Sequence, residues 1–126
     1  MSQSTARLRR LLADELGECC DADVEQRLDE LHALADDAFA DDDARAVFRV
    51  LGNDTRYRLA RALAAAGDER CVCELEAVVD VSESAVSHAL SDLVDAGLAD
   101  RRKDGNWRYY ESTDLADRVL AAAEDR

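Results

Sequence analysis

The sequence has no apolar segment long enough to cross a bilayer, and no basic-then-apolar leader of the kind that directs secretion. It also has no Ser-His-Asp pattern, no phosphate-binding loop and no convergent cluster of histidine and glutamate. Internal repeats and low-complexity linkers are absent too. We therefore expect a soluble, cytoplasmic protein of 126 residues that has a modest core and is not an enzyme.

Basic residues are scarce as well. Lysine and arginine together number 16 against 29 aspartates and glutamates, which gives a net charge of −13, and Lys103 is the single lysine. Such acidity is typical of a cytoplasm at very high salt, where self-repulsion is screened, so we expect an extreme halophile as the source. Residues 1–43 carry 13 acidic and 4 basic residues. The remainder of the chain is therefore much closer to neutrality and can bind a polyanion such as DNA.

The N-terminal part predicts two helices. Residues 4–17 have leucines on one helical face and a glycine stop, and residues 24–39 have an apolar seam at alternating spacings of four and three. The seam consists of Val24, Leu28, Leu31, Ala35 and Ala38. Such a seam usually packs against another helix, often one from a second subunit. We therefore interpret residues 1–40 as a helical extension for dimerisation and ligand donation, and 41–126 as the functional domain.

Downstream, apolar spacing and glycine stops predict helices that precede and follow a hairpin. The expected helices cover residues 44–52, 55–67, 71–79, 83–97 and 113–126. The expected N-caps are Asn53 or Asp54 for the second of these helices and Ser82 for the fourth. Helix, turn, helix and hairpin in this order predict a dimeric winged helix-turn-helix, mainly α with a two-stranded β-hairpin wing.

One face of the helix over 83–97 suits DNA. A stripe at helical spacing contains Ser84, Ser87, His88 and Ser91. Hydroxyls and an imidazole can hydrogen-bond to base edges and phosphates, whereas carboxylates would repel the backbone of DNA. The alternative is an ordinary solvated helix face.

The hairpin supplies positive charge. Its strands, 98–103 and 106–111, flank the dipeptide Asp104-Gly105, a strong two-residue turn signal. Around this turn Lys103 would lie opposite Asn106, Arg102 opposite Trp107 and Arg101 opposite Arg108. The predicted DNA contacts on the wing are Arg101, Arg102, Lys103 and Arg108. Two opposed arginines are explained by a phosphate backbone lying against them. The alternative is an edge kept positive to prevent aggregation.

Cys71 and Cys73 open the short helix before this stripe. Side chains two residues apart on a regular helix point about 200° apart, which suits neither a shared core position nor a shared ion. If Cys71 takes the cap position with non-helical angles, Cys73 inside the helix can join it on one soft ion. The alternative is that Cys71 fills the core beside Leu75 and Val78, while Cys73 is incidental.

The chain from Leu51 to Ser112 strongly resembles the ArsR/SmtB family of winged-helix repressors. The pieces that carry the resemblance are "LGNDTRYRLARAL", "CVCEL", "VSESAVSHALSDLVDAGL" and "RRKDGNWRYYE". Asn53-Asp54 stands where the family usually has Asp-Pro. The resemblance implies a cytoplasmic homodimer, joined through its first and last helices, that occupies a double-stranded operator with an inverted repeat. A bound metal or metalloid ion, As(III), Cd(II), Pb(II) or Zn(II), would release the DNA.

The resemblance also implies a ligand set. In several members "CVC" supplies soft-metal ligands, which maps onto Cys71 and Cys73, and others add ligands from an N-terminal segment, a description that Cys19 and Cys20 fit. No third thiol follows within the same helix, so we expect Cys19 or Cys20 to supply it. The last helix lacks the histidine of a further family site, and we expect no zinc site there.

Three alternatives remain open at this point. The same cysteine pairs could form reversible disulfides in a thiol-redox sensor. The chain could be a winged-helix regulator without a metal ligand, or a dimerisation module that no longer touches DNA. The basic wing argues against the last of these.

Overall fold

The computed structural model describes residues 3–17, 20–38 and 42–124. The chain divides into two compact units, Met1–Asp41 and Asp42–Arg126. No helix in the part of the chain that is described is long and apolar enough to cross a membrane.

The first unit is a pair of helices, α1 (Gln3–Leu16) and α2 (Asp21–Ala38). Leu12 and Val24 are buried, and the ion pair between Arg9 and Asp21, 2.8 Å long, joins the two helices. Val24, the first residue of the predicted seam, thus lies buried within this unit. Leu34, farther along α2, is 64% exposed.

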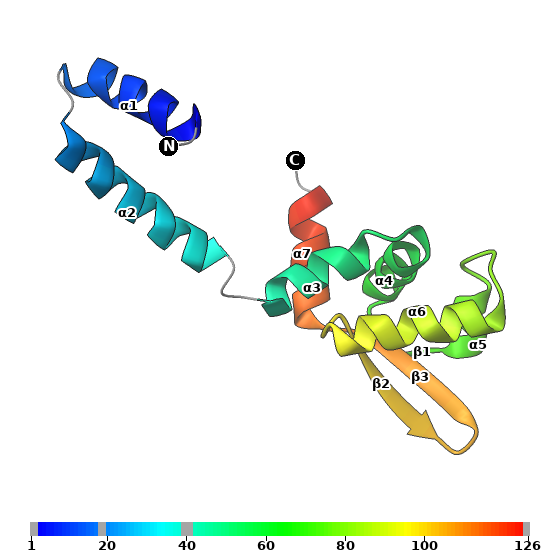
Figure 1. Ribbon diagram of the computed structural model, residues 1–126. Helices are drawn as coiled ribbons and strands as arrows, with labels where there is room; N and C mark the ends of the chain where they lie inside the picture. The colour runs from blue at the N-terminus through cyan, green and yellow to red at the C-terminus, as the bar shows by residue number, and fades with distance from the viewer. Residues whose placement is uncertain (1–2, 18–19, 39–41, 125–126) are drawn as a thin grey trace. The chain divides into compact units, whose positions relative to one another are not determined.

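The second unit contains the remaining elements, and in Figure 1 its hairpin projects away from the helices. The helices are α3 (Asp42–Leu51), α4 (Asp54–Ala66), α5 (Val72–Glu76), α6 (Glu83–Asp95) and α7 (Asp114–Glu124). The strands are β1 (Arg70–Cys71), β2 (Ala99–Asp104) and β3 (Trp107–Ser112). The predicted winged helix-turn-helix class is confirmed.

The core of this unit lies between α4, α6 and the base of the sheet. Leu59, Leu63, Leu90, Leu93 and Tyr110 are almost completely buried. Each buried leucine contributes about 1.5–3 kcal/mol relative to an exposed one, so this packing fixes α6 against α4. One face of α6 is therefore committed to the core, and the opposite face is left for contacts outside the molecule.

The predicted helix ends are mostly where the caps place them. The side chain of Asn53 accepts a hydrogen bond from the backbone N–H of Arg56, and that of Ser82 accepts one from Ala85. Gly67 ends α4 with φ +70°, in the left-handed region that glycine adopts without strain. The helix that begins after Cys71 is shorter than predicted. After Glu76 its backbone N–H groups donate to the carbonyl three residues earlier, as in a 3₁₀ turn, and the α-helix ends there.

The sheet differs from the prediction in two ways. It has three strands, because Arg70 and Cys71 pair with Tyr110 and Tyr109 of β3. The two-residue strand β1 was missed because two residues show no periodicity.

The register of the hairpin also differs. Asp104 pairs with Trp107, so Gly105 and Asn106 form the turn, and the predicted turn at Asp104-Gly105 is wrong. Gly105 has φ +63° and no residue other than glycine among those described has a positive φ. In a turn of this kind only the first of the two central residues has a positive φ, and glycine adopts it without strain. The turn therefore has Gly105 as its first central residue, and not Asp104.

The new register changes the partners of the basic residues. The predicted pairs Lys103 with Asn106, Arg102 with Trp107 and Arg101 with Arg108 are all wrong: Lys103 lies opposite Arg108, Arg102 opposite Tyr109 and Arg101 opposite Tyr110. Each partner has moved by two residues, and side chains alternate between faces with a period of two. Arg101, Lys103 and Arg108 therefore share one face of the hairpin in either register.

Candidate DNA-binding surface and cysteine site

The polar stripe of α6 lies opposite its buried face. Val86, Ala89, Leu90 and Leu93 point into the core. The predicted DNA contacts Ser84, Ser87 and His88 are exposed and Ser91 is partly so. Within this stripe no side chain is an acid. The stripe can therefore donate and accept hydrogen bonds at a groove edge without repelling phosphate.

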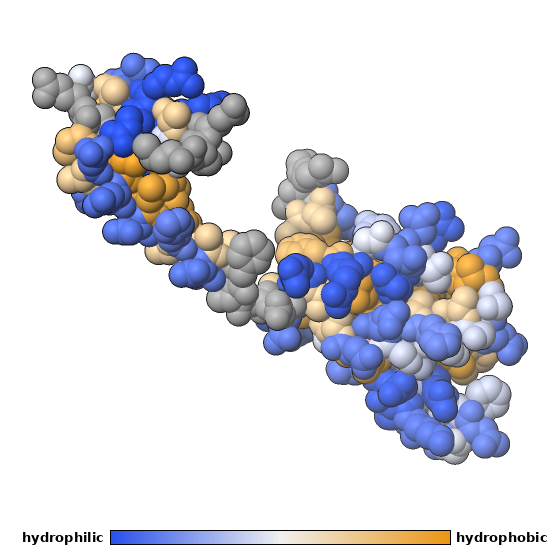
Figure 2. All heavy atoms as spheres, viewed as in Figure 1, coloured by the Kyte–Doolittle hydropathy of each residue, from blue (hydrophilic) through white to orange (hydrophobic). Residues whose placement is uncertain are grey.

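The wing presents one cationic face. Arg101, Lys103 and Arg108 are exposed, and none of them forms an ion pair with a described residue. Figure 2 shows the hairpin covered by hydrophilic side chains. Unpaired cations on one face of a projecting hairpin suit contact with a phosphate backbone.

Arg102 differs from these three residues. It lies on the opposite face of the hairpin, where it pairs with Glu69 at 2.8 Å and stacks over the ring of Tyr109 at 4.7 Å from the centroid. The hydrogen bond to Glu69 is the main reason that the pKa of Arg102 is raised. The structure thus separates Arg102 from the other three predicted wing residues.

Cys71 and Cys73 come together at the head of the helix-turn-helix. Cys71 has extended angles, φ −69° and ψ 148°, and is the N-cap of α5, while Cys73 lies inside the helix. The thiol of Cys73 donates to Cys71 Sγ, and the two sulfur atoms are 2.9 Å apart. The cap position with non-helical angles that was considered for Cys71 is confirmed, and it removes the separation of about 200° between the two side chains on a regular helix. Cys71 is 6% exposed and Cys73 is exposed, so the pair is open to solvent on one side.

A reciprocal cap holds this turn. The backbone N–H of Cys73 donates to Cys71 Sγ at 3.4 Å, and the backbone N–H of Cys71 donates to Glu74 Oε1 at 3.1 Å. This is a capping box with cysteine in the place of serine or threonine. The role of Glu74 was not predicted from the sequence, although the pattern Cys-x-x-Glu at a helix start was a usable signal.

The same contacts shift two pKa values. The backbone N–H of Cys71 and the guanidinium of Arg70 lower the pKa of Glu74. The hydrogen bond to Cys71 raises the pKa of Cys73, and the negative charge of Glu74 adds to the effect. An ion that binds both sulfur atoms must displace their protons, so its affinity rises with pH.

The other two predicted ligands lie in the first unit. Cys19 is outside the described residues. Cys20 is exposed at the start of α2, where its backbone N–H and its thiol donate to Asp23 Oδ2 at 3.1 and 3.3 Å. Among the described residues, no group of three or more histidine, cysteine, aspartate or glutamate side chains is placed to hold a metal.

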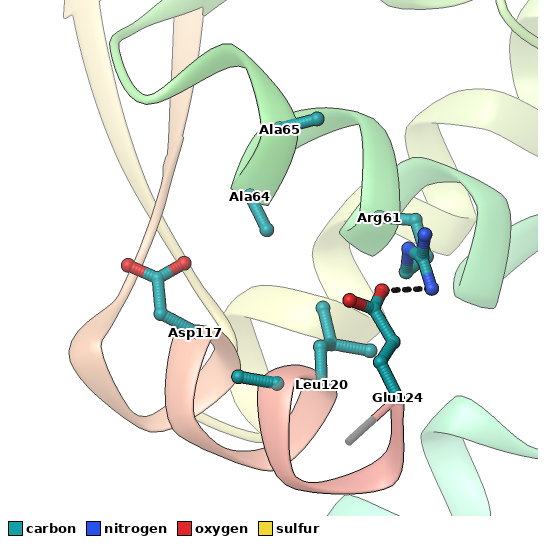
Figure 3. Close-up of a pocket in the computed structure, with 7 residues that line it drawn as sticks. Arg61, Ala64, Ala65, Asp117, Leu120 and Glu124 are labelled. Carbon is teal, nitrogen blue, oxygen red and sulfur yellow. Dashed lines mark ion pairs between the residues drawn. The ribbon is translucent and has the colours of Figure 1, made fainter. Parts of the chain in front are cut away.

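The carboxylates of α7 are engaged elsewhere. Figure 3 shows Asp117 and Glu124 at different ends of a cavity of about 280 Å³ between α4 and α7. Glu124 forms an ion pair with Arg61, and Asp117 accepts a hydrogen bond of 2.6 Å from the hydroxyl of Ser112. These two carboxylates do not converge on one point.

An apolar groove runs along α3, α4 and α7. It has a volume of about 590 Å³ and is lined by Phe48, Leu51, Gly52, Tyr57, Val119, Leu120, Ala122 and Ala123. Phe48 is 69% exposed beside it. An exposed aromatic ring at an apolar groove is typical of a surface that a partner covers.

Comparisons with known proteins identify the family. Residues 53–101 match the family described as bacterial regulatory protein, arsR family. The chain is 51% identical to a putative arsenical resistance operon repressor of Halobacterium salinarum, over 94% of each chain. The chain belongs to the arsR family. This arsR-family chain is a DNA-binding transcriptional regulator with a winged helix fold, not an enzyme.

Two further proteins resemble part of this arsR-family chain. A cadmium resistance transcriptional regulatory protein homologue of Staphylococcus aureus is 38% identical over 57% of this chain and 59% of its own length. A crystal structure described as a possible transcriptional regulator for arsenical resistance is 38% identical, with a TM-score of 0.52, over 61% of this chain and 78% of that one. The halophilic origin expected from the acidic composition agrees with the Halobacterium relative.

Proposed function

We propose that this chain is a homodimeric, cytoplasmic repressor that holds an operator through α6 and the wing and releases it when a soft ion binds Cys71 and Cys73. The observation that carries the proposal is the 2.9 Å contact between the two sulfur atoms at the head of the helix-turn-helix. Thiolates prefer soft ions, and relatives named for arsenic and cadmium resistance support ions of the arsenite, cadmium or lead class, with zinc as a further candidate.

The DNA contacts divide into two kinds. Ser84, Ser87, His88 and Ser91 are proposed to meet base edges and nearby phosphates in the major groove. Arg101, Lys103 and Arg108 are proposed to meet the phosphate backbone. Arg102 can join them only by leaving Glu69, so we expect a smaller contribution from it.

Release requires more than two sulfur atoms. Two thiolates alone make a weak site, and we propose that Cys19 or Cys20, from the partner subunit, supplies the third. Closing that ring would pull the head of the helix-turn-helix toward the N-terminal segment and change the spacing of the two α6 helices. Typical couplings of about 1–3 kcal/mol, or 5–150-fold in affinity, suffice for derepression.

The identity of the ion is tested by titrating the reduced protein with arsenite, cadmium, lead and zinc. Thiolate coordination is expected to add ultraviolet absorption in proportion to the ion bound, and the same ions are expected to release DNA. The Cys71→Ser and Cys73→Ser variants serve as matched controls that should show less absorption. Release of DNA by an ion that adds no absorption would contradict a thiolate site.

A thiol-redox sensor is the second candidate, because the same sulfur contact suits a reversible disulfide between Cys71 and Cys73. Oxidation would remove two protons and two electrons and join the two sulfur atoms. A disulfide-forming oxidant should then release DNA in the absence of any ion. Titration of DNA binding with oxidant and with arsenite, in parallel, separates the two candidates.

Dimerisation is expected to depend on the apolar groove of α3 and α7. The two-fold symmetry of the dimer should be mirrored in the operator, with half-sites about 34 Å apart or a multiple of that distance. Replacing Phe48 with glutamate should give a monomer, because it places a charge on this apolar surface. Sedimentation velocity in molar salt measures the change. Val78→Glu, at an exposed apolar residue that does not line the groove, is the matched control and should stay dimeric. A parent protein that sediments as a monomer would refute the dimer.

A further inference from the structure

Arg56, in the first turn of α4, makes contacts with two other helices. Its side chain is 25% exposed. Nε donates to the carbonyl oxygen of Val50 at 2.7 Å, and a terminal nitrogen donates to that of Arg49 at 3.4 Å. The other terminal nitrogen pairs with Asp92 Oδ2 at 3.3 Å. One guanidinium group thus has three acceptors on two separate elements.

The first two acceptors belong to the last turn of α3. Carbonyl groups at a helix C-terminus have no partner within the helix, and a cation there also interacts favourably with the helix dipole. α3 carries Phe48, the exposed ring beside the apolar groove. Arg56 is therefore fixed to the helix that is proposed to form the dimer.

The third acceptor belongs to the recognition helix. Asp92 lies one helical turn after His88, and both line a cavity of about 250 Å³ together with Arg56. A carboxylate at this point of a DNA-facing helix would repel phosphate unless it were neutralised. Arg56 supplies the neutralising charge and at the same time a directed hydrogen bond, because the guanidinium donors have a fixed planar geometry.

We infer that Arg56 is a positioning residue that ties the dimer helix α3 to the recognition helix α6 through Asp92, and so sets the spacing at which the two α6 helices of a dimer meet their half-sites. The inference rests on the proposed dimeric DNA-binding function. It does not depend on the ion or on the cysteines. Arg56 acts through α6 and does not itself contact DNA.

The test measures spacing selectivity. One duplex is an inverted repeat recovered from random DNA by the parent protein, and the other is the same repeat with one base pair inserted between its half-sites, which moves them by about 3.4 Å. The parent should prefer the first duplex. Arg56→Lys should reduce that preference by about fivefold or more, the lower end of typical couplings, because an ammonium keeps the charge but cannot hold three acceptors in one plane.

Asp92→Asn is the second variant, since it leaves the bonds from Arg56 to α3 intact and should not disturb folding. It should lose spacing preference as well, and the double variant should lose no more than the larger single loss. Arg58→Lys, on the same helix at an exposed position, is the matched control and should keep the preference of the parent. A merely structural role would weaken binding to both duplexes equally and leave the preference unchanged.

Three outcomes overturn the inference in distinguishable ways. If the parent selects no inverted repeat, the proposed dimeric function fails and the inference fails with it. If the parent is selective and both Arg56→Lys and Asp92→Asn keep its full preference, the inference alone is wrong. Stronger binding of Asp92→Asn to both duplexes, with unchanged preference, would show that the pair acts only through charge.

Discussion

Replacing Cys71 or Cys73 with serine is expected to leave operator affinity unchanged while abolishing release by arsenite and cadmium. In the parent, release should lower affinity by about 5–150-fold. Each variant removes one of the two sulfur atoms that lie 2.9 Å apart, and an alcohol is a poor ligand for a soft ion. Operator binding is measured by fluorescence anisotropy with and without each ion.

The fold of these variants should survive. Serine is among the preferred N-cap residues, so Cys71→Ser retains an acceptor for the backbone N–H of Cys73. Glu74→Gln is the matched control, because it perturbs the same capping box without touching a thiol, and it should still release DNA. If both serine variants release DNA as the parent does, the cysteines are not the sensor.

Replacing Arg101 or Arg108 with alanine is expected to weaken binding to every DNA sequence alike. Each lost phosphate contact should lower the slope of log affinity against log salt by about one. Arg102→Ala, on the same strand as Arg101, is the matched control. Its charge is already paired with Glu69, so its effect on the salt slope should be smaller.

The recognition helix should behave differently from the wing. Ser87→Ala or His88→Ala is expected to cost about 1–3 kcal/mol at particular base pairs and little elsewhere. Binding to a set of operator variants with single base-pair changes, at several salt concentrations, separates the two patterns. The wing assignment is wrong if alanine at both Arg101 and Arg108 leaves affinity unaltered at all salt concentrations.

Local signals in the sequence predicted most of the winged unit. Asn53 and Ser82 have side chains that cap a helix wherever it starts, and Gly67 tolerates a left-handed backbone, so these ends follow from a few neighbouring residues. The position of Cys71 as a cap was predicted for a similar reason, since the spacing to Cys73 is incompatible with two regular helical positions.

Other features depend on residues far apart in the chain and carry no local signal. The strand β1 exists because Arg70 and Cys71 meet β3 some 40 residues later. The contact between Arg56 and Asp92 spans 36 residues. The turn register was missed because Asp104-Gly105 and Gly105-Asn106 are both good turn dipeptides. A turn at Asp104-Gly105 would need a positive φ at Asp104 as well as at Gly105, and only Gly105 has one. The third sulfur ligand of the ion also stays a prediction, because it too would come from a residue far away in the sequence.

The sulfur cap of α5 has an evolutionary consequence. Sulfur is a weak acceptor, so a cysteine at an N-cap stabilises the helix less than the serine or aspartate usually found there. Under the proposed function, selection for folding alone would therefore tend to remove Cys71, and only exposure to the toxic ion would retain it. Lineages that leave contaminated habitats should accumulate alleles in which this position has drifted to an oxygen-bearing residue. Such alleles would encode a well-folded protein that represses permanently.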